Sequence, residues 1–184
     1  MIDSLAHLCE RLGPAPKADP YLVLTLHRPS NVDDPVHLRS LLLAIQEGSS
    51  ARIVFPVHPR TEQILSTADI VSALDSARWE MRPPAGYREF IELLRSSRGV
   101  VTDSGGIQEE TTWLGIPCLT LRETTERPST VELGTNVLVG VDPAAVRNAL
   151  SAPHGSTRSI TPPLWDGRAA ERIVRQILLF LARA

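Results

Sequence analysis

The sequence predicts an α/β protein, a Rossmann-like domain built on a doubly wound parallel sheet. Short, nearly continuous runs of Val, Ile and Leu recur along the chain, as in strands that are buried on both faces. Amphipathic helical patterns separate these runs. Strands and helices that alternate through right-handed crossovers build such a sheet, and ligands bind at the carboxyl ends of its strands.

The elements follow one another in a regular order. The apolar runs predict strands over residues 21–26, 52–57, 99–102, 118–121 and 135–139. The helical patterns between them predict helices over residues 36–47, 87–94, 106–114 and 125–133. Residues 151–163 are rich in Ser, Thr, Pro and Gly and predict a loop. A strongly apolar helix over 168–182 follows, and we expect it to pack back onto the protein.

The beginning of the chain differs from the rest. Residues 1–20 contain one apolar helix followed by Pro14, Pro16 and Pro20, a pattern that resembles a linker between domains. We therefore expect residues 1–20 to be an interdomain helix and linker, and residues 21–184 to be one domain. A chain of 184 residues is long enough to bury a single core.

Composition excludes several classes of partner. The formal net charge is −2, with 19 basic and 21 acidic residues interspersed, so neither nucleic acid nor an anionic membrane is expected to bind. Cys9 and Cys118 lie far apart, outside any metal-ligand spacing, and are expected to be buried, inert thiols. No metal or cofactor is expected. The longest apolar stretch, 177–182, is too short for a membrane span, which favours a cytoplasmic protein.

Residues 100–110 carry the most informative pattern, a buried strand that leads into a glycine pair at the start of a helix. Gly105 and Gly106 would let a phosphate approach the free N–H groups at the positive end of the helix, and the Ser104 hydroxyl would add a donor. The alternative is a flexible turn without a ligand.

Helical periodicity places Glu110 on the same face as Ile107, Thr111 and Leu114, whereas Gln108, Glu109 and Thr112 share the opposite face. A carboxylate on an apolar face needs a partner, and the two hydroxyls of a ribose would serve. A structural salt bridge or a half-exposed glutamate is the alternative.

Arg127 stands near the start of the next predicted helix, with Thr125 as the expected cap and Pro128 in the first turn. The helix dipole disfavours a cation there, so a nearby anion such as a diphosphate would explain the arginine. The alternative is an ion pair with Glu123 or Glu126.

Several residues follow predicted strands or begin a helix beside the expected crevice. His58 ends the second strand, and His27 and Arg28 end the first, so each could contact a phosphate or handle protons. Tyr87 and Phe90 lie three residues apart at a helix start and could present an aromatic platform to a base, although core packing is the more common use.

Together these residues resemble the non-hydrolysing UDP-N-acetylglucosamine 2-epimerases, enzymes of the two-domain B-type glycosyltransferase fold. The similarity covers roughly residues 20–180 and is carried by five motifs: LHRPSNV at 26–32, PVHP at 56–59, DSGGIQEE at 103–110, TTERP at 124–128 and DGRAAERI at 166–173. The resemblance implies that this chain is the C-terminal, nucleotide-binding half of that fold.

The resemblance also implies roles for individual residues. The diphosphate is assigned to Ser104, Gly105 and Gly106, the ribose to Glu110, the uracil region to Phe90, and the phosphates near the sugar to Arg127 and His58. His58 is the catalytic candidate on this chain, and Arg28 and Tyr87 are further possible contacts. Two positions depart from the family pattern: Ser30 replaces a common glutamate, and Ala85 stands where some members have a glutamine, which leaves the base contacts there open.

The family reaction inverts the carbon that bears the acetamido group, by eliminating UDP and adding it back. The resemblance places the carboxylates for this chemistry in an N-terminal domain that is absent here, so the isolated chain is expected to bind UDP or UDP-N-acetylglucosamine and to be inactive. That domain, in cis or as a separate subunit, is the expected partner, and the full-length protein is expected to be a homodimer. A hydrolysing epimerase, half of a glycosyltransferase and a stand-alone UDP-sugar-binding module remain alternatives.

Overall fold

The computed structural model describes residues 1–17, 19–152 and 161–182. Its centre is a six-stranded sheet in the order β3-β2-β1-β4-β5-β6, and every neighbouring pair of strands is parallel. The order reverses between β1 and β4, which confirms the doubly wound, Rossmann-like class. The strands are β1 (Tyr21–Thr25), β2 (Arg52–Pro56), β3 (Trp79–Arg82), β4 (Gly99–Thr102), β5 (Cys118–Thr120) and β6 (Asn136–Leu138).

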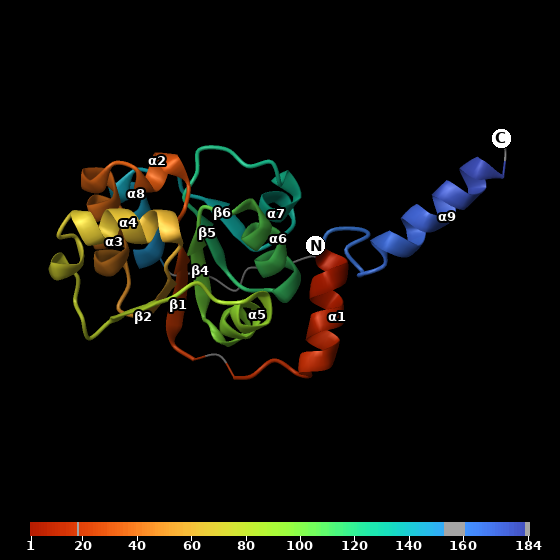
Figure 1. Ribbon diagram of the computed structural model, residues 1–184, viewed down its shortest axis with the longest axis horizontal. Coiled ribbons are helices and arrows are strands. Elements are labelled where there is room, and N and C mark those ends of the chain that lie inside the picture. Colours follow the sequence, from red (N-terminus) through yellow and green to blue (C-terminus); the bar gives the residue numbers. More distant parts are fainter. Residues whose placement is uncertain (18, 153–160, 183–184) are drawn as a thin grey trace.

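Helices cover both faces of the sheet (Figure 1). One layer contains α2 (Pro29–Val32), α3 (Pro35–Gly48), α4 (Pro59–Thr67), a 3-10 turn (Val71–Ala73) and α8 (Pro143–Ser151). The other layer contains α1 (Ile2–Leu12), α5 (Tyr87–Ser96) and α6 (Gly105–Leu114). Helix α7 (Pro128–Glu132) lies near β6, and α9 (Ala169–Leu181) extends away from the body of the protein on the side of α1.

Alternating side chains of β1 divide the core between these layers. Leu22 and Leu24 face the cluster that α3 and α8 complete, whereas Tyr21 and Val23 face the cluster of α1, α5 and α6. Both faces of the strand are therefore buried, which explains why its sequence is apolar without alternation.

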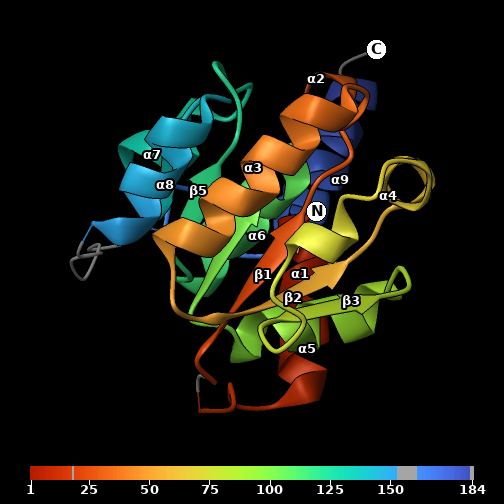
Figure 2. The same cartoon turned by 90° about the vertical axis from the view of Figure 1, so that its left-hand side faces the viewer.

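The layer of α3 and α8 is held by a close helix crossing (Figure 2). A Cβ atom on Gly48 would lie 2.7 Å from the carbonyl oxygen of Arg147 and 2.8 Å from Cβ of Leu150. Only glycine fits at this position, because both neighbours belong to the facing helix and cannot move independently.

Helix α1 packs against the opposite layer. Leu5 and Leu8 are buried in the same cluster as Ile91 and Leu94 of α5 and Ile107 of α6. The first two turns of α1 therefore belong to the hydrophobic core of the described chain.

Helix α9 does not pack back onto the sheet, so that prediction was wrong. None of its residues is buried in the described part of the chain, and in Figure 1 it extends away from the body of the protein. It is attached at its first turn, where the amide of Ala170 donates to Oδ2 of Asp3 at 2.8 Å. Seven large apolar side chains are exposed on it: Ile173, Val174, Ile177, Leu178, Leu179, Phe180 and Leu181. No helix in the described residues is long and apolar enough to span a bilayer.

Other local expectations need correction. Thr125 does not cap a helix: α7 begins at Pro128 with Arg127 as its N-cap, and the Thr125 hydroxyl instead accepts a hydrogen bond from the Arg127 amide at 3.0 Å. Cys118 is buried, and burial raises the pKa of its thiol to about 11, but Cys9 is only half-buried. Most of the loop predicted at 151–163 lies outside the described residues, and Ser151 itself is the last residue of α8.

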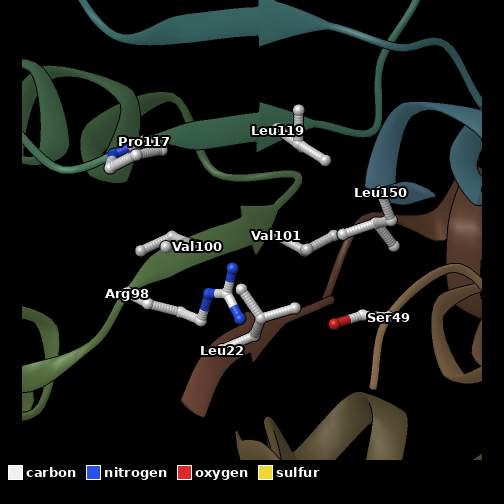
Figure 3. Close-up of a pocket in the computed structure, with 9 residues that line it drawn as sticks. Leu22, Ser49, Arg98, Val100, Val101, Pro117, Leu119 and Leu150 are labelled. Atoms are coloured by element: carbon white, nitrogen blue, oxygen red, sulfur yellow. The ribbon is translucent and has the colours of Figure 1, made fainter. Parts of the chain in front are cut away.

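A small cavity of about 70 Å³ lies at the amino ends of β1, β4 and β5 (Figure 3). Leu22, Val101, Leu119 and Leu150 supply its apolar wall, and Arg98 lies at its edge. Ligands of doubly wound folds bind at the opposite, carboxyl ends of the strands, so this cavity lies at the far end of the sheet from the usual ligand position.

Candidate nucleotide-sugar site

A larger cavity, of about 310 Å³, opens at the carboxyl ends of β1 and β2 and at the amino end of α6. This volume is at the lower end of the range for small-molecule sites. The cavity adjoins the point between β1 and β4 where the strand order reverses, the usual ligand position in this fold. Its lining includes His27, His58, Ala85, Phe90, Ser104 and Ile107.

The loop after β1 is held by Asp103, the first residue after β4. The Asp103 carboxylate is fully buried and accepts hydrogen bonds from the backbone amides of His27 and Arg28 at 3.0 and 2.9 Å. The side-chain amide of Asn31 donates to the same carboxylate at 3.1 Å. Arg28 returns the contact, because its Nε donates to the Asp103 carbonyl oxygen at 3.0 Å.

His27 and Asp103 also form a dyad. Nδ1 of His27 lies 2.9 Å from Oδ1 of Asp103, which leaves Nε2 as the imidazole nitrogen available to a ligand. The hydrogen bond from this ring raises the pKa of His27. Burial alone would raise the pKa of Asp103, but its hydrogen bonds to His27 and to the two backbone amides hold that pKa below its usual value.

His58 stands opposite His27, with 5.5 Å between the ring centroids. It is the N-cap of α4, and its Nδ1 accepts a hydrogen bond from the amide of Arg60 at 3.2 Å. A neutral His58 must then carry its proton on Nε2, so the ring is a donor on its other side. This geometry favours a contact with a ligand oxygen over proton abstraction.

The predicted phosphate cradle is the amino end of α6. Ser104 is the N-cap residue, and within the described residues its hydroxyl makes no capping hydrogen bond. A Cβ on Gly105 would meet no atom closer than 3.9 Å, so this backbone is open to a ligand. Gly106 is more crowded, because the Met1 side chain would lie 3.1 Å from its Cβ. Both glycines allow an anion to approach the free N–H groups of the first turn.

Gln108 links the cradle to the loop after β5. Its Nε2 donates to the Ser104 carbonyl oxygen at 3.2 Å, and its Oε1 accepts from the Thr125 hydroxyl at 2.6 Å and from Asn136 at 3.1 Å. Gln108 is fully buried, as is Thr112, so both faces of α6 are covered. The cradle and the loop that contains Arg127 are therefore one connected structure.

Glu110 is buried on α6, as its periodicity predicted, but it is not among the residues that line the 310 Å³ cavity. It is only 6% exposed, and burial raises the pKa of its carboxyl, an effect that a hydrogen bond from Tyr87 partly offsets. Burial and the charge of Glu110 raise the pKa of Tyr87 to about 12. Tyr87 faces a separate groove beside Leu8 of α1, so Tyr87 and Phe90 do not form one aromatic platform.

Arg127 lies against Glu109, so the alternative of an ion pair with Glu123 or Glu126 was wrong. Its Nε lies 2.8 Å from Oε1 of Glu109. The two groups form an ion pair, but the Nε–H does not point at the carboxylate well enough to make a hydrogen bond. Glu126 instead accepts hydrogen bonds from both terminal nitrogens of Arg122. Glu123 accepts a hydrogen bond from the amide of Val141 at 3.3 Å.

The sequence pattern did not indicate the roles of Asp103, Asn31 and Arg122. Asp103, directly after β4, holds the loop after β1 through its amides and through Asn31 of α2, and Arg122 lies beside Gly105. A buried polar residue at a strand end is the available signal, since such a residue must be hydrogen-bonded to something.

Comparison with known proteins shows the family of this chain. A family model for UDP-N-acetylglucosamine 2-epimerase matches residues 1–178. The UDP-N-acetylglucosamine 2-epimerase of Methanococcus maripaludis is 36% identical over 171 residues, which are 91% of this chain and 47% of that protein. The UDP-2,3-diacetamido-2,3-dideoxy-D-glucuronate 2-epimerase of Pseudomonas aeruginosa is also 36% identical, over 87% of this chain and 44% of that protein.

Solved structures give the same result. The Methanocaldococcus jannaschii UDP-GlcNAc 2-epimerase in complex with UDP-GlcNAc and UDP superposes with a TM-score of 0.85 at 33% identity, over 97% of this chain and 52% of that chain. The Neisseria meningitidis enzyme bound to UDP-GlcNAc gives 0.78 at 27% identity, over 96% of this chain and 53% of that one. This chain spans about half the length of these relatives. It belongs to the UDP-N-acetylglucosamine 2-epimerase family.

Proposed function

We propose that this chain is the nucleotide-binding half of a non-hydrolysing epimerase that interconverts UDP-N-acetylglucosamine and UDP-N-acetylmannosamine. The observation that carries the proposal is the position of the 310 Å³ cavity, at the strand-order reversal and directly beside the open amino end of α6. The imidazoles of His27 and His58 line this cavity, and the guanidinium of Arg127 forms an ion pair with Glu109 of α6. A diphosphate meets a complementary charge there.

The nucleotide is proposed to bind as the family pattern implies. Backbone N–H groups at Gly105 and Gly106, with the Ser104 hydroxyl, hold the diphosphate at the positive end of α6. Arg127 neutralises it, and Nε2 of His58 donates to an oxygen near the sugar. Arg28 borders the same site.

The nucleoside end follows from the remaining residues. Glu110 accepts hydrogen bonds from the ribose hydroxyls, and a diol would satisfy a carboxylate that now has Tyr87 as its hydrogen-bond donor. Phe90 and Ala85 line the uracil end of the cavity. The methyl group of Ala85 cannot hydrogen-bond to the base, so this side chain offers it only van der Waals contact.

The reaction needs a proton removed from the carbon bearing the acetamido group, while the bond from the anomeric carbon to the diphosphate oxygen breaks. UDP leaves with that bond pair, and its re-addition with a proton on the other face gives the epimer. His27, His58 and the arginines are suited to stabilise the departing diphosphate, and the raised pKa of His27 lets it supply a proton to that leaving group.

The base for the sugar carbon is assigned to the half of the enzyme that this chain does not span. We propose that residues 1–20 form the connection to an N-terminal domain, that this domain supplies the carboxylates, in cis or as a separate subunit, and that the whole protein is a homodimer. The chain alone is then inactive.

A second candidate is epimerisation of a UDP-diacetamido uronic acid, which the similarity to the Pseudomonas aeruginosa enzyme favours. The two substrates share UDP and differ in the sugar, whose contacts lie on the other half. A hydrolysing epimerase, half of a glycosyltransferase and a stand-alone binding module are the further alternatives. Product analysis of the full-length protein separates them. A UDP-linked epimer indicates a non-hydrolysing epimerase, and a free sugar indicates a hydrolysing one. Transfer of the sugar to an acceptor indicates a glycosyltransferase, and no reaction indicates a binding module.

The test of the division of labour uses the 184-residue chain in deuterated water with UDP-N-acetylglucosamine. NMR should detect no exchange at the carbon bearing the acetamido group, and exchange should appear when the N-terminal domain is added. Exchange by the chain alone, above that of a His58→Ala variant, would refute the assignment of the base to the other half.

A further inference from the structure

The loop after β5 carries a second arginine, Arg122, in addition to Arg127. The side chain of Arg122 is only 9% exposed, and its two terminal nitrogens donate to the two carboxylate oxygens of Glu126 at 2.7 and 2.6 Å. Glu126 itself is largely exposed, with 60% of its side chain accessible. A buried guanidinium is thus satisfied by a carboxylate that reaches it from the surface.

This pair lies against the phosphate cradle. A Cβ atom on Gly105 would be 3.9 Å from Oε2 of Glu126 and 4.0 Å from Nη1 of Arg122. Arg28 is close enough for its charge to act on Glu126. The carboxylate therefore occupies space beside the first residue of α6, where the cradle meets two guanidinium groups.

A carboxylate and a phosphate present the same geometry to an arginine, two oxygens facing the two branches of the fork. An arginine cannot shed its charge, so burying Arg122 without an anion would be costly. Arg122 holds the pKa of Glu126 down to about 2, so the carboxylate is charged at neutral pH. The surrounding backbone of α6 also favours an anion at this point.

We propose that Arg122 is a further diphosphate-binding residue and that Glu126 holds its place in the absence of ligand. When a phosphate enters the cradle, it takes over the fork of Arg122, and the Glu126 carboxylate moves out to solvent. Arg127 follows Glu126 directly in the chain, so the same rearrangement can free it from Glu109 to meet the ligand. This inference rests on the proposed function, because it names an additional contact and a competitor at the same site.

The proposal predicts that Glu126→Gln improves binding of anions. Isothermal titration of the 184-residue chain with UDP should give a dissociation constant lower by roughly threefold to tenfold, because a competing charge is removed. Glu123→Gln is the matched control: it removes the same charge from the same loop, but Glu123 contacts Val141 and Gly140, away from Gly105. Its dissociation constant should stay within about twofold.

Arg122→Lys supplies the complementary test. It keeps the positive charge and loses the fork, so UDP affinity should fall by roughly fivefold or more, while affinity for uridine, which has no phosphate, should not change. Circular dichroism checks that this variant is folded, and Glu126→Gln, whose change is at the surface, tests the proposal independently.

The outcomes separate the two levels of inference. If Glu126→Gln binds UDP more weakly, or no better than Glu123→Gln, the pair only supports the loop and the proposal is overturned. If the unaltered chain binds neither UDP nor inorganic pyrophosphate, the proposed function fails together with it. If UDP does not bind, but pyrophosphate binds and does so more tightly to Glu126→Gln, then phosphate does displace Glu126 from Arg122. The assignment of UDP as the ligand fails in that case.

Discussion

Replacing Asp103 with asparagine should destabilise the protein and loosen the loop that carries His27 and Arg28. The carboxylate is fully buried and accepts three hydrogen bonds at Oδ2, from the amides of His27 and Arg28 and from Asn31. At Oδ1 it faces Nδ1 of His27. No other side chain joins the loop after β1 to the loop after β4 with as many contacts in the part of the chain that the structure describes.

The magnitude follows from how an asparagine would fit. Its NH2 group can turn toward Nδ1 of His27, which then becomes the acceptor, so its oxygen keeps the three remaining donors. The bonds become neutral ones, and a charge-assisted bond contributes about 1 kcal/mol more than a neutral bond. Over these contacts we expect the free energy of unfolding to fall by about 2–4 kcal/mol.

The pKa shifts of Asp103 and His27 predict how this stabilisation changes with pH. The pKa of Asp103 is lowered in the folded protein, so its contribution is present above about pH 4 and is lost as the pH falls through the lowered pKa. The pKa of His27 is raised, so its contribution is present below about pH 6.5 and is lost as the pH rises through the raised pKa. The dyad therefore stabilises most between these limits, and both slopes should flatten in Asp103→Asn.

The measurement is urea unfolding followed by tryptophan fluorescence at several pH values. Asp34→Asn is the control, because its carboxylate also accepts a backbone N–H, from Val36 at 2.9 Å, but it is an exposed helix cap that asparagine serves equally well. An Asp103→Asn variant within about 0.5 kcal/mol of the unaltered chain would refute the reasoning that the carboxylate charge organises this loop.

Two further predictions test the site and the fold. Glu110→Ala and Arg127→Ala should each weaken UDP binding by about 1–3 kcal/mol in calorimetry, with the stronger salt dependence at Arg127, which meets charge rather than hydroxyls. Either residue is structural if its variant lowers the melting temperature and leaves UDP affinity unchanged. Gly48→Ala should cost about 1–3 kcal/mol of unfolding free energy, because its methyl would meet Arg147 and Leu150. Gly86→Ala, where no atom lies within 4 Å, should cost less than about 1 kcal/mol, because the weaker N-cap is partly offset by the lower entropy of the unfolded chain.

The central strands could be predicted because burial on both faces makes them apolar throughout. The edge strand β3 could not: of Trp79–Arg82 only the tryptophan is buried, so no apolar run marks it. Helix α8 was missed for a similar reason, since only Val146 and Leu150 face the core. Helix α4 begins directly after His58, at Pro59, and has a weak apolar pattern as well.

The candidate site divides in the same way. Residues whose roles depend on the chain near them, such as Ser104, Gly105 and Glu110, could be proposed from the strand-to-helix pattern. The role of Asp103 depends on β1 and β4 being neighbours, with Thr25 opposite Thr102 across 77 residues of sequence. Pattern along the chain carries no information on such pairings, and the contacts of His27, Arg28 and Asn31 became visible only with the sheet order.

Helix α9 was predicted within one residue at each end, and its packing was still wrong. Its periodicity indicates that one face requires cover, but periodicity does not specify what supplies it. The direction of the helix is fixed by contacts just before it. Gly167 has a φ of 77°, and a Cβ there would lie 2.8 Å from Cβ of Ala6. The backbone at Gly167 therefore packs directly against α1 before α9 begins. The Asp3 carboxylate then accepts from the amide of Ala170 and caps the first turn. Contacts at this first turn therefore set where α9 points, and its apolar face contributes nothing to the core of the described chain.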